Sequence, residues 1–232
     1  MLILGIETST KTGSVAVVSD DCVIAQYSLN IALTHSERLM ATVDRVLRDI
    51  RLAIPDLDGF AVSIGPGSFT GLRIGISTVK GLSFATGKPV AAVPTLQALA
   101  WNLPFAGYPV CPLLDARKKE VYAAIYKNVD SFPVQTMTET VISLSQLAAW
   151  VSGATVFTGE GSHIYRAEIE QIFSKRALFA PRSAMLPSAA AVAEIGLTML
   201  RSGKQADLDA LTPKYIRRPE AEVAWERKQR SR

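Results

Sequence analysis

Two carboxylates stand at equivalent places in the two halves of the chain, each directly after an apolar run. Glu7 follows residues 2–6, and Asp115 follows residues 110–114. Acidic loops from two domains can flank a nucleotide phosphate and its magnesium, because hard cations prefer carboxylate oxygens. The pattern therefore leaves open an enzyme that hydrolyses ATP with Glu7 and Asp115 on magnesium.

The neighbouring loop residues support such a site only in part. Thr8 and Ser9 continue the loop after Glu7, and the backbone of Gly159 and Gly161 can lie near an adenosine. However, no glycine follows Glu7 where a phosphate must touch the backbone. These residues are candidate nucleotide or phosphate contacts, and no catalytic role is assigned to any of them.

A glycine-rich segment at residues 65–73 offers a second place for an anion, because it stands between a predicted strand and a predicted helix. It fits neither common nucleotide motif. Gly67 and Gly71 have the wrong spacing for a P-loop and no lysine follows, while the third glycine comes one residue too late for the dinucleotide fingerprint. The alternative is a tight turn that starts a helix.

The helix expected at residues 72–85 contains several small residues. Gly75 lies near the same face as Gly71, and Gly81 is close by. Each internal glycine costs ~1 kcal/mol relative to alanine, so the glycines need a compensating reason. Small side chains let a second helix approach closely, and that helix can belong to this chain or to a partner.

Histidine and cysteine chemistry finds little support. His35 and His163 are the only histidines, and neither they nor the two cysteines have ligand spacing, so we expect no metal site and no histidine-based triad. We expect Cys22 and Cys111 to be buried reduced thiols, since both have apolar neighbours. We find no secretory leader and no apolar run that could span a membrane, so the expected location is cytoplasmic.

The basic excess of the chain is confined to its end. Residues 213–232 hold seven basic and three acidic residues, which accounts for the whole net charge of +4. Such a tail can help to hold RNA phosphates, or it can simply be solvated.

Both halves of the chain begin with short strands and then alternate helices with strands. Residues 104–109, with two prolines and a glycine, are typical of a linker. We therefore predict an α/β protein with domains at residues 1–105 and 106–232, whose tail at 213–232 packs back or is mobile. The predicted strands are 2–6, 14–18, 23–29, 60–64, 90–93, 110–114, 121–126 and 155–158, and the predicted helices are 34–50, 72–85, 95–101, 143–150, 162–173 and 188–202.

Four segments of the sequence resemble the TsaB (YeaZ) family: residues 6–9, residues 63–75 with the glycine-rich block, residues 115–122 and residues 213–217. The resemblance implies two actin-like (ASKHA, ribonuclease H-like) domains, each a mixed sheet flanked by helices. One position departs from the family, whose first motif usually begins Asp-Thr-Ser. Here Glu7 is longer by one methylene, which displaces the carboxylate and makes a magnesium role less well supported.

The resemblance also implies a function. TsaB proteins act in forming N6-threonylcarbamoyladenosine at position 37 of bacterial tRNAs that read codons beginning with adenine. In that pathway TsaB is the non-catalytic partner of the transferase TsaD, the ATPase TsaE joins them, and TsaB forms a homodimer when TsaD is absent. No cofactor is expected on this chain alone, whereas ATP or ADP and magnesium can bind in the complex. Contact with tRNA is expected to be indirect, and none with a membrane is expected. The family's older name, glycoprotease, suggests a peptidase, but neither a metal pair nor a convincing triad is present.

The expected partner surface lies on the two helices of the first half, residues 34–50 and 72–85. Two such helices can meet a matching pair in a four-helix interface. The alternative is that these side chains only cover their own sheet, and a second apolar face would discriminate between the two. The expected centre, with Gly75 permitting close contact, consists of Leu39, Met40, Val43, Leu72, Gly75, Ile76 and Val79.

Overall fold

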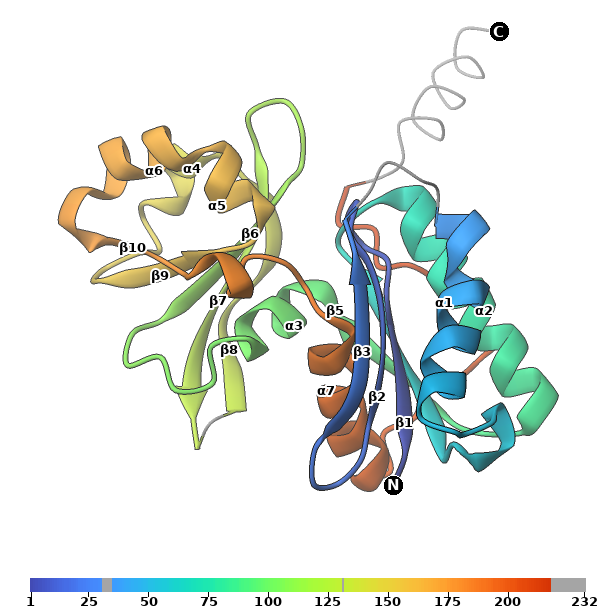
Figure 1. Ribbon diagram of the computed structural model, residues 1–232. Helices are drawn as coiled ribbons and strands as arrows, with labels where there is room; N and C mark the ends of the chain where they lie inside the picture. Colours follow the sequence, from blue (N-terminus) through green and yellow to red (C-terminus); the bar gives the residue numbers. More distant parts are fainter. Residues whose placement is uncertain (31–34, 131, 218–232) are drawn as a thin grey trace, which may run out of the picture.

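The computed structural model of the 232-residue chain describes residues 1–30, 35–130 and 132–217. Two five-stranded sheets stand side by side, and helices pack against each of them (Figure 1). Thr34, the first residue of the helix predicted at 34–50, and most of the predicted basic tail lie outside the described residues.

The first sheet has the strand order β3-β2-β1-β4-β5. Its central strand β1 pairs antiparallel with β2 and parallel with β4. The central strands are buried along nearly their whole length because both faces of the sheet are covered, whereas the edge strand β3 is mostly exposed. The strands are β1 (Ile3–Glu7), β2 (Gly13–Val18), β3 (Val23–Leu29), β4 (Gly59–Gly65) and β5 (Val90–Pro94).

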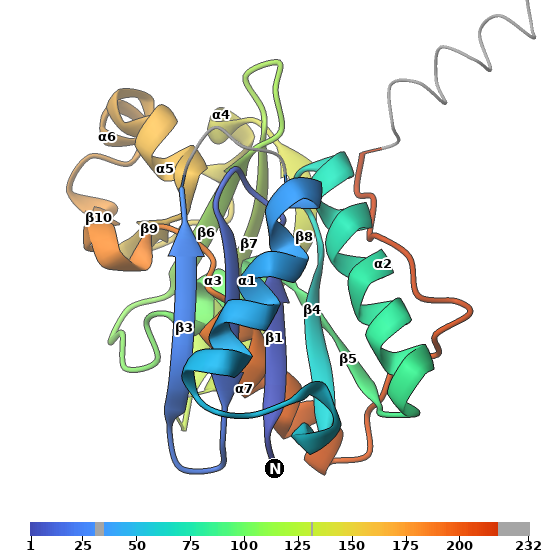
Figure 2. The ribbon, with the colours of Figure 1, turned by 45° about the vertical axis from the view of Figure 1, so that its right-hand side comes forward.

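Three helices cover this sheet (Figure 2). Helices α1 (His35–Asp49) and α2 (Phe69–Thr86) lie on one face and α7 (Ala189–Arg201) lies on the other. The short helix η1 (Ile54–Asp56) follows α1 and contacts α2. Each face of the sheet therefore has its own apolar core.

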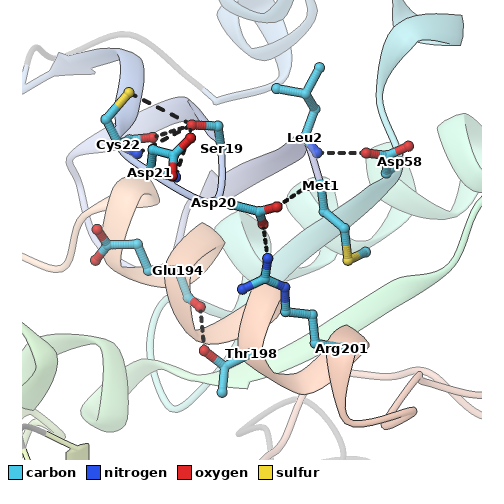
Figure 3. A network of polar contacts seen from close by, with 10 residues as sticks. All are labelled: Met1, Leu2, Ser19, Asp20, Asp21, Cys22, Asp58, Glu194, Thr198 and Arg201. Atoms are coloured by element: carbon cyan, nitrogen blue, oxygen red, sulfur yellow. Dashed lines mark hydrogen bonds and ion pairs between the residues drawn. The ribbon is translucent and has the colours of Figure 1, made fainter.

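The position of α7 differs from the sequence-based domain division, which assigned residues 106–232 to the second half. Its alanine-rich face packs on β1, β4, β2 and β5, and Gly196 lies so close to Ala61 that an added Cβ would be 2.4 Å from the Ala61 Cβ. Its last turn is tied to the first half as well. Asp20 lies 2.5 Å from the Arg201 guanidinium and 2.7 Å from the Met1 ammonium (Figure 3). The first half thus includes a helix from the end of the chain.

The second sheet has the order β10-β9-β6-β7-β8. It repeats the topology of the first sheet: its first strand is central, its second and third strands follow antiparallel on one side, and its fourth and fifth follow parallel on the other. The strands are β6 (Val110–Asp115), β7 (Val121–Val129), β8 (Phe132–Ile142), β9 (Thr155–Thr158) and β10 (Ala177–Phe179).

Short helices surround the second sheet, and α3 (Thr95–Trp101) packs between the halves against strands of both sheets. The other elements are α4 (Leu144–Leu147), α5 (Glu160–Ile164), α6 (Arg166–Phe173), η2 (Ser174–Arg176) and η3 (Arg182–Ala184).

Three local expectations were wrong. Strands β8 and β10 were not predicted. The single helix predicted at 162–173 is interrupted at Tyr165, and the Ser162 hydroxyl donates to the Gly159 carbonyl at 2.7 Å. Cys22 is exposed in the turn between β2 and β3, whereas Cys111 is buried as expected, and burial raises the pKa of its thiol.

Candidate functional site: the cleft between the halves and the outer face of α1 and α2

A cleft of about 990 Å³ lies between the two halves at the ends of their central strands. The first half contributes the loop after β1 and the first turn of α2, and the second half contributes the end of β6 and the turn that follows it. The residues used below that line it are Ser9, Lys11, Phe69, Asp115, Ala116, Arg117 and Glu160.

The glycine-rich loop and the loop after β1 are pressed against each other. The Ser9 carbonyl accepts a hydrogen bond from the Ser68 amide at 2.6 Å, and a Cβ on Gly67 would lie 2.4 Å from that carbonyl. Gly65 has φ +114°, a conformation that glycine adopts without strain. Ser68 then caps α2 by accepting the Gly71 amide at 3.3 Å. The glycines here serve backbone packing and a helix start, which agrees with the tight turn proposed as the alternative to a phosphate cradle.

Glu7 does not face the cleft. Its side chain is completely buried, and one carboxylate oxygen accepts the Ser9 amide at 2.5 Å. The other oxygen has no hydrogen-bond partner among the described residues. Burial raises the pKa of the Glu7 carboxyl, because a charge is poorly solvated there. Its neighbour Thr8 is buried too and donates its hydroxyl to the Gly71 carbonyl at 2.8 Å.

Asp115 and Ser9 are the predicted nucleotide contacts that do line the cleft. One Asp115 oxygen accepts the Arg117 amide and the Tyr165 hydroxyl, both at 2.9 Å. The structure does not bring Glu7 into the cleft beside Asp115, so the proposed pair of magnesium ligands is not assembled there. Among residues 1–30, 35–130 and 132–217, no group of three His, Cys, Asp or Glu side chains could hold a metal ion.

The two glycines predicted near an adenosine lie against β6 instead of in the cleft. A Cβ on Gly159 would be 2.2 Å from the Leu113 carbonyl oxygen, and one on Gly161 would be 2.9 Å from the same oxygen. Gly159 also has φ +92°. Close packing of the α5 start on the sheet therefore explains both glycines.

Glu160, between those glycines, does line the cleft and was not predicted. Burial and the nearby charge of Asp115 raise the pKa of its carboxyl, while Lys11 and Arg117 oppose that shift. The feature of the sequence that could have identified Glu160 is its place between two glycines at the start of a helix. The cleft thus presents carboxylates and basic groups together, a mixed lining suited to a polar ligand.

Most residues of the predicted partner surface are buried in the chain's own core, so that assignment was wrong for them. The side chains that α1 and α2 turn toward the sheet form this core, because a helix can bury only one face against its own sheet. Met40, 48% exposed, is the exception. The buried members are Leu39, Val43, Leu72, Gly75, Ile76 and Val79.

Gly75 illustrates the error. A Cβ at this position would lie 2.4 Å from the Thr8 hydroxyl, so the missing side chain lets α2 approach the end of β1. Gly81, on the exposed side of α2, has no atom within 4 Å of its Cβ position. The glycine that leaves room for another molecule is therefore Gly81.

The outer face of α2 carries an apolar and small-residue stripe. Ser77, Gly81 and Phe84 follow at helical spacing and are exposed, with Phe84 91% accessible. On α1, Met40 borders a groove of about 550 Å³ that continues along Leu47 to η1. Of the second apolar face that was to discriminate a partner surface from a simple sheet cover, the structure shows the exposed side chains of Met40 and Phe84, while the other exposed residues of α1 are mostly charged.

No helix in the described part of the chain is both long and apolar enough to cross a membrane.

Comparisons with known proteins agree with this architecture. A family model described as "TsaD: tRNA N6-adenosine threonylcarbamoyltransferase" matches residues 29–225. The chain is 30% identical over 231 residues to the Bacillus subtilis protein named tRNA threonylcarbamoyladenosine biosynthesis protein TsaB, which covers 97% of this chain and 98% of that protein.

Solved structures show the same fold. YeaZ from Pseudomonas aeruginosa matches with a TM-score of 0.80 and 27% identity over 92% of this chain and 99% of that one. The activator of 2-hydroxyisocaproyl-CoA dehydratase from Clostridium difficile matches with a TM-score of 0.53 over 88% and 97% of the two chains; at 9% identity it indicates the fold alone. The predicted actin-like fold, with a mixed sheet flanked by helices in each half, is confirmed.

Proposed function

Because the chain belongs to the TsaB (YeaZ) family, we propose that it is the non-catalytic partner of the transferase TsaD in forming N6-threonylcarbamoyladenosine at position 37 of tRNAs that read codons beginning with adenine. The observation that carries the partner role is the outer face of α2, where Gly81 has open space around it and Phe84 is almost fully exposed. An exposed phenylalanine beside a glycine on a well-formed helix suits contact with another protein.

The state of Glu7 supports the non-catalytic half of the proposal. A carboxylate that binds magnesium must be ionised and accessible. Glu7 is sealed from the cleft, and its raised pKa reflects the cost of ionising it there. The alternative, ATP hydrolysis with Glu7 and Asp115 on magnesium, therefore has one reachable carboxylate instead of two.

The partner surface proposed here differs from the sequence-based one in its residues but not in its helices. Met40 on α1 and Ser77, Gly81 and Phe84 on α2 replace the buried side chains as its centre. Two exposed helices of a partner can pack on them in a four-helix contact, with Gly81 admitting the closest approach. The same face would serve the homodimer that we propose when TsaD is absent.

The rest of the assembly follows from the same premise. We expect the ATPase TsaE to join the pair in the cytoplasm, with ATP or ADP and magnesium bound in the complex and tRNA contacted through the partners.

The test is a titration of TsaD with this protein, followed by calorimetry and size-exclusion chromatography. Gly81→Leu should weaken binding at least tenfold, because the new side chain occupies the space a partner helix needs, and Phe84→Ala should weaken it as well. Gly153→Leu is the matched control, since Gly153 also has no atom within 4 Å of its Cβ position but lies in the second half.

Unchanged affinity in both α2 variants, with unchanged folding, would remove this surface from the proposal. A direct ATPase assay of the protein alone decides the alternative: turnover that is lost in both Glu7→Gln and Asp115→Asn would replace the non-catalytic role by the enzymatic one.

A further inference from the structure

The segment that follows α7 returns along the first half (Figure 2). It ends beside the cleft, where Arg217 contacts Ala116. Its last described part, residues 211–217, is called the strap below. Leu211 is buried in the core beneath α1 and α2. The Lys214 amide donates to the Ile64 carbonyl at 2.7 Å, at the end of β4. The strap is thus fixed to the first half by its backbone as well as by an apolar anchor.

Tyr215 adds an aromatic anchor on the same half. Its ring stacks on Phe69 with centroids 5.1 Å apart and planes at 24°. The Arg73 Nε donates to the Tyr215 hydroxyl at 3.0 Å, and the Arg73 guanidinium lies 3.9 Å from the Phe69 ring centroid. Because Phe69 lines the cleft, this anchor lies on one of its walls.

The strap also contacts the second half through two basic side chains. Lys214 Nζ lies 2.5 Å from a carboxylate oxygen of Glu139 on β8, whose side chain is only 2% exposed. The Arg217 guanidinium donates to the Ala116 carbonyl and pairs with Glu120, both in the turn between β6 and β7. Ala116 lines the opposite wall of the cleft.

We propose that the strap is a latch that fixes the opening of the cleft by joining its two walls. Hinged two-domain proteins change the width of such a cleft by rotating one half about the connections between them. Here residues 102–109 and 180–188 and the packing of α3 form those connections. The strap adds a further link that has to break when the halves rotate apart.

The chemistry of the link makes it reversible but biased toward closure. Opening would break the ion pair between Lys214 and Glu139, which salt screens less than a surface pair because the Glu139 side chain is only 2% exposed while the pair is formed. The Arg217–Glu120 pair is partly exposed, so salt screens it and it contributes less. The aromatic contact keeps the strap on the first half when the ion pairs break.

The latch can be tested in the full-length chain by measuring the distance between the halves. Nitroxide labels are placed on exposed Cys22 in the first half and on an introduced cysteine, Lys127→Cys, at an exposed position of β7 in the second half; Cys111 is buried and stays unlabelled. Double electron–electron resonance then reports the distance distribution. For the wild type we expect one narrow distance distribution. In the double variant Lys214→Met with Arg217→Ala, the distribution should become broader and its mean should shift.

The control double variant is Lys204→Met with Arg48→Ala. It also removes one lysine and one arginine charge. The arginine, Arg48, forms an ion pair with Asp44 inside α1 and not between the halves. It should keep the narrow distribution. Raising the salt concentration should broaden the wild-type distribution and leave the latch variant unchanged.

An unchanged distribution in a folded latch variant overturns the proposal. If that variant does not fold, Glu120→Gln removes the Arg217 pair from the other side. A narrow distribution that persists in this variant at high salt, identical to that of the wild type at low salt, again overturns the proposal.

Discussion

Replacing Gly75 with alanine is expected to destabilise the protein, although alanine is the better helix former by ~1 kcal/mol. The new methyl would lie 2.4 Å from the Thr8 hydroxyl oxygen, while its other neighbours, Val62 and Ile6, are at ordinary contact distances of 3.5 and 3.6 Å. Thr8 cannot yield freely, since it is buried and donates to the Gly71 carbonyl at 2.8 Å.

The magnitude follows from those contacts. Overpacking costs about 1–3 kcal/mol, and disturbing the buried hydroxyl costs about 1–3 kcal/mol more. Alanine's higher helix propensity offsets ~1 kcal/mol of this cost. The free energy of unfolding should therefore fall by about 3 kcal/mol, which corresponds to a decrease in Tm of roughly 6–12 °C for a chain of this size.

Urea unfolding of four variants tests this reasoning. Gly81→Ala, on the open side of the same helix, should stabilise by about 0.5–1 kcal/mol. Thr8→Ala removes the obstructing oxygen, so Gly75→Ala should cost much less when it is combined with Thr8→Ala than it does alone. A Gly75→Ala variant as stable as Gly81→Ala would refute the argument, and so would strictly additive effects at positions 8 and 75.

Two further predictions concern carboxylates whose pKa values the fold shifts. Burial raises the pKa of Glu7, so its stabilising protonated form is fully present below about pH 4.3 and is lost as the pH rises through the folded value. Glu7→Gln should therefore flatten the decline of unfolding free energy with rising pH; urea titrations from pH 4 to 8 that show parallel curves would contradict this. The Met1 ammonium, and then Arg201, lower the pKa of Asp20, so its contribution is present above about pH 3.9 and is lost as the pH falls through the lowered value. Asp20→Asn should lower the Tm more at pH 7 than at pH 2, and an equal Tm loss at both would count against the contacts in Figure 3.

The elements that the sequence predicts well are those whose signals are local. The strands of the first half are short apolar runs between turn residues, and Gly203 after α7 has the left-handed conformation expected at a helix end. β8 was missed because it is a partly exposed edge strand whose threonine- and glutamate-containing sequence shows no buried run.

The candidate site depended on tertiary contacts in a way that spacing could not reveal. Either Gly75 or Gly81 could admit a neighbouring helix when α2 is considered alone. The folded chain shows that Thr8 already fills the space beside Gly75, whereas the space beside Gly81 is open. Glu7 looked like a ligand because it ends a strand, yet its side chain turns into the protein and not into the cleft.

The sequence by itself determined the repeated α/β pattern, because propensity and periodicity act over a few residues, and its motifs carried the resemblance to the family. Tertiary structure alone decided that α7 packs on the first sheet, that Lys214 reaches Glu139, and which face of α2 remains exposed. These depend on contacts between residues far apart in the chain, and such contacts exist only once the two sheets and the segments that cross between them are in place.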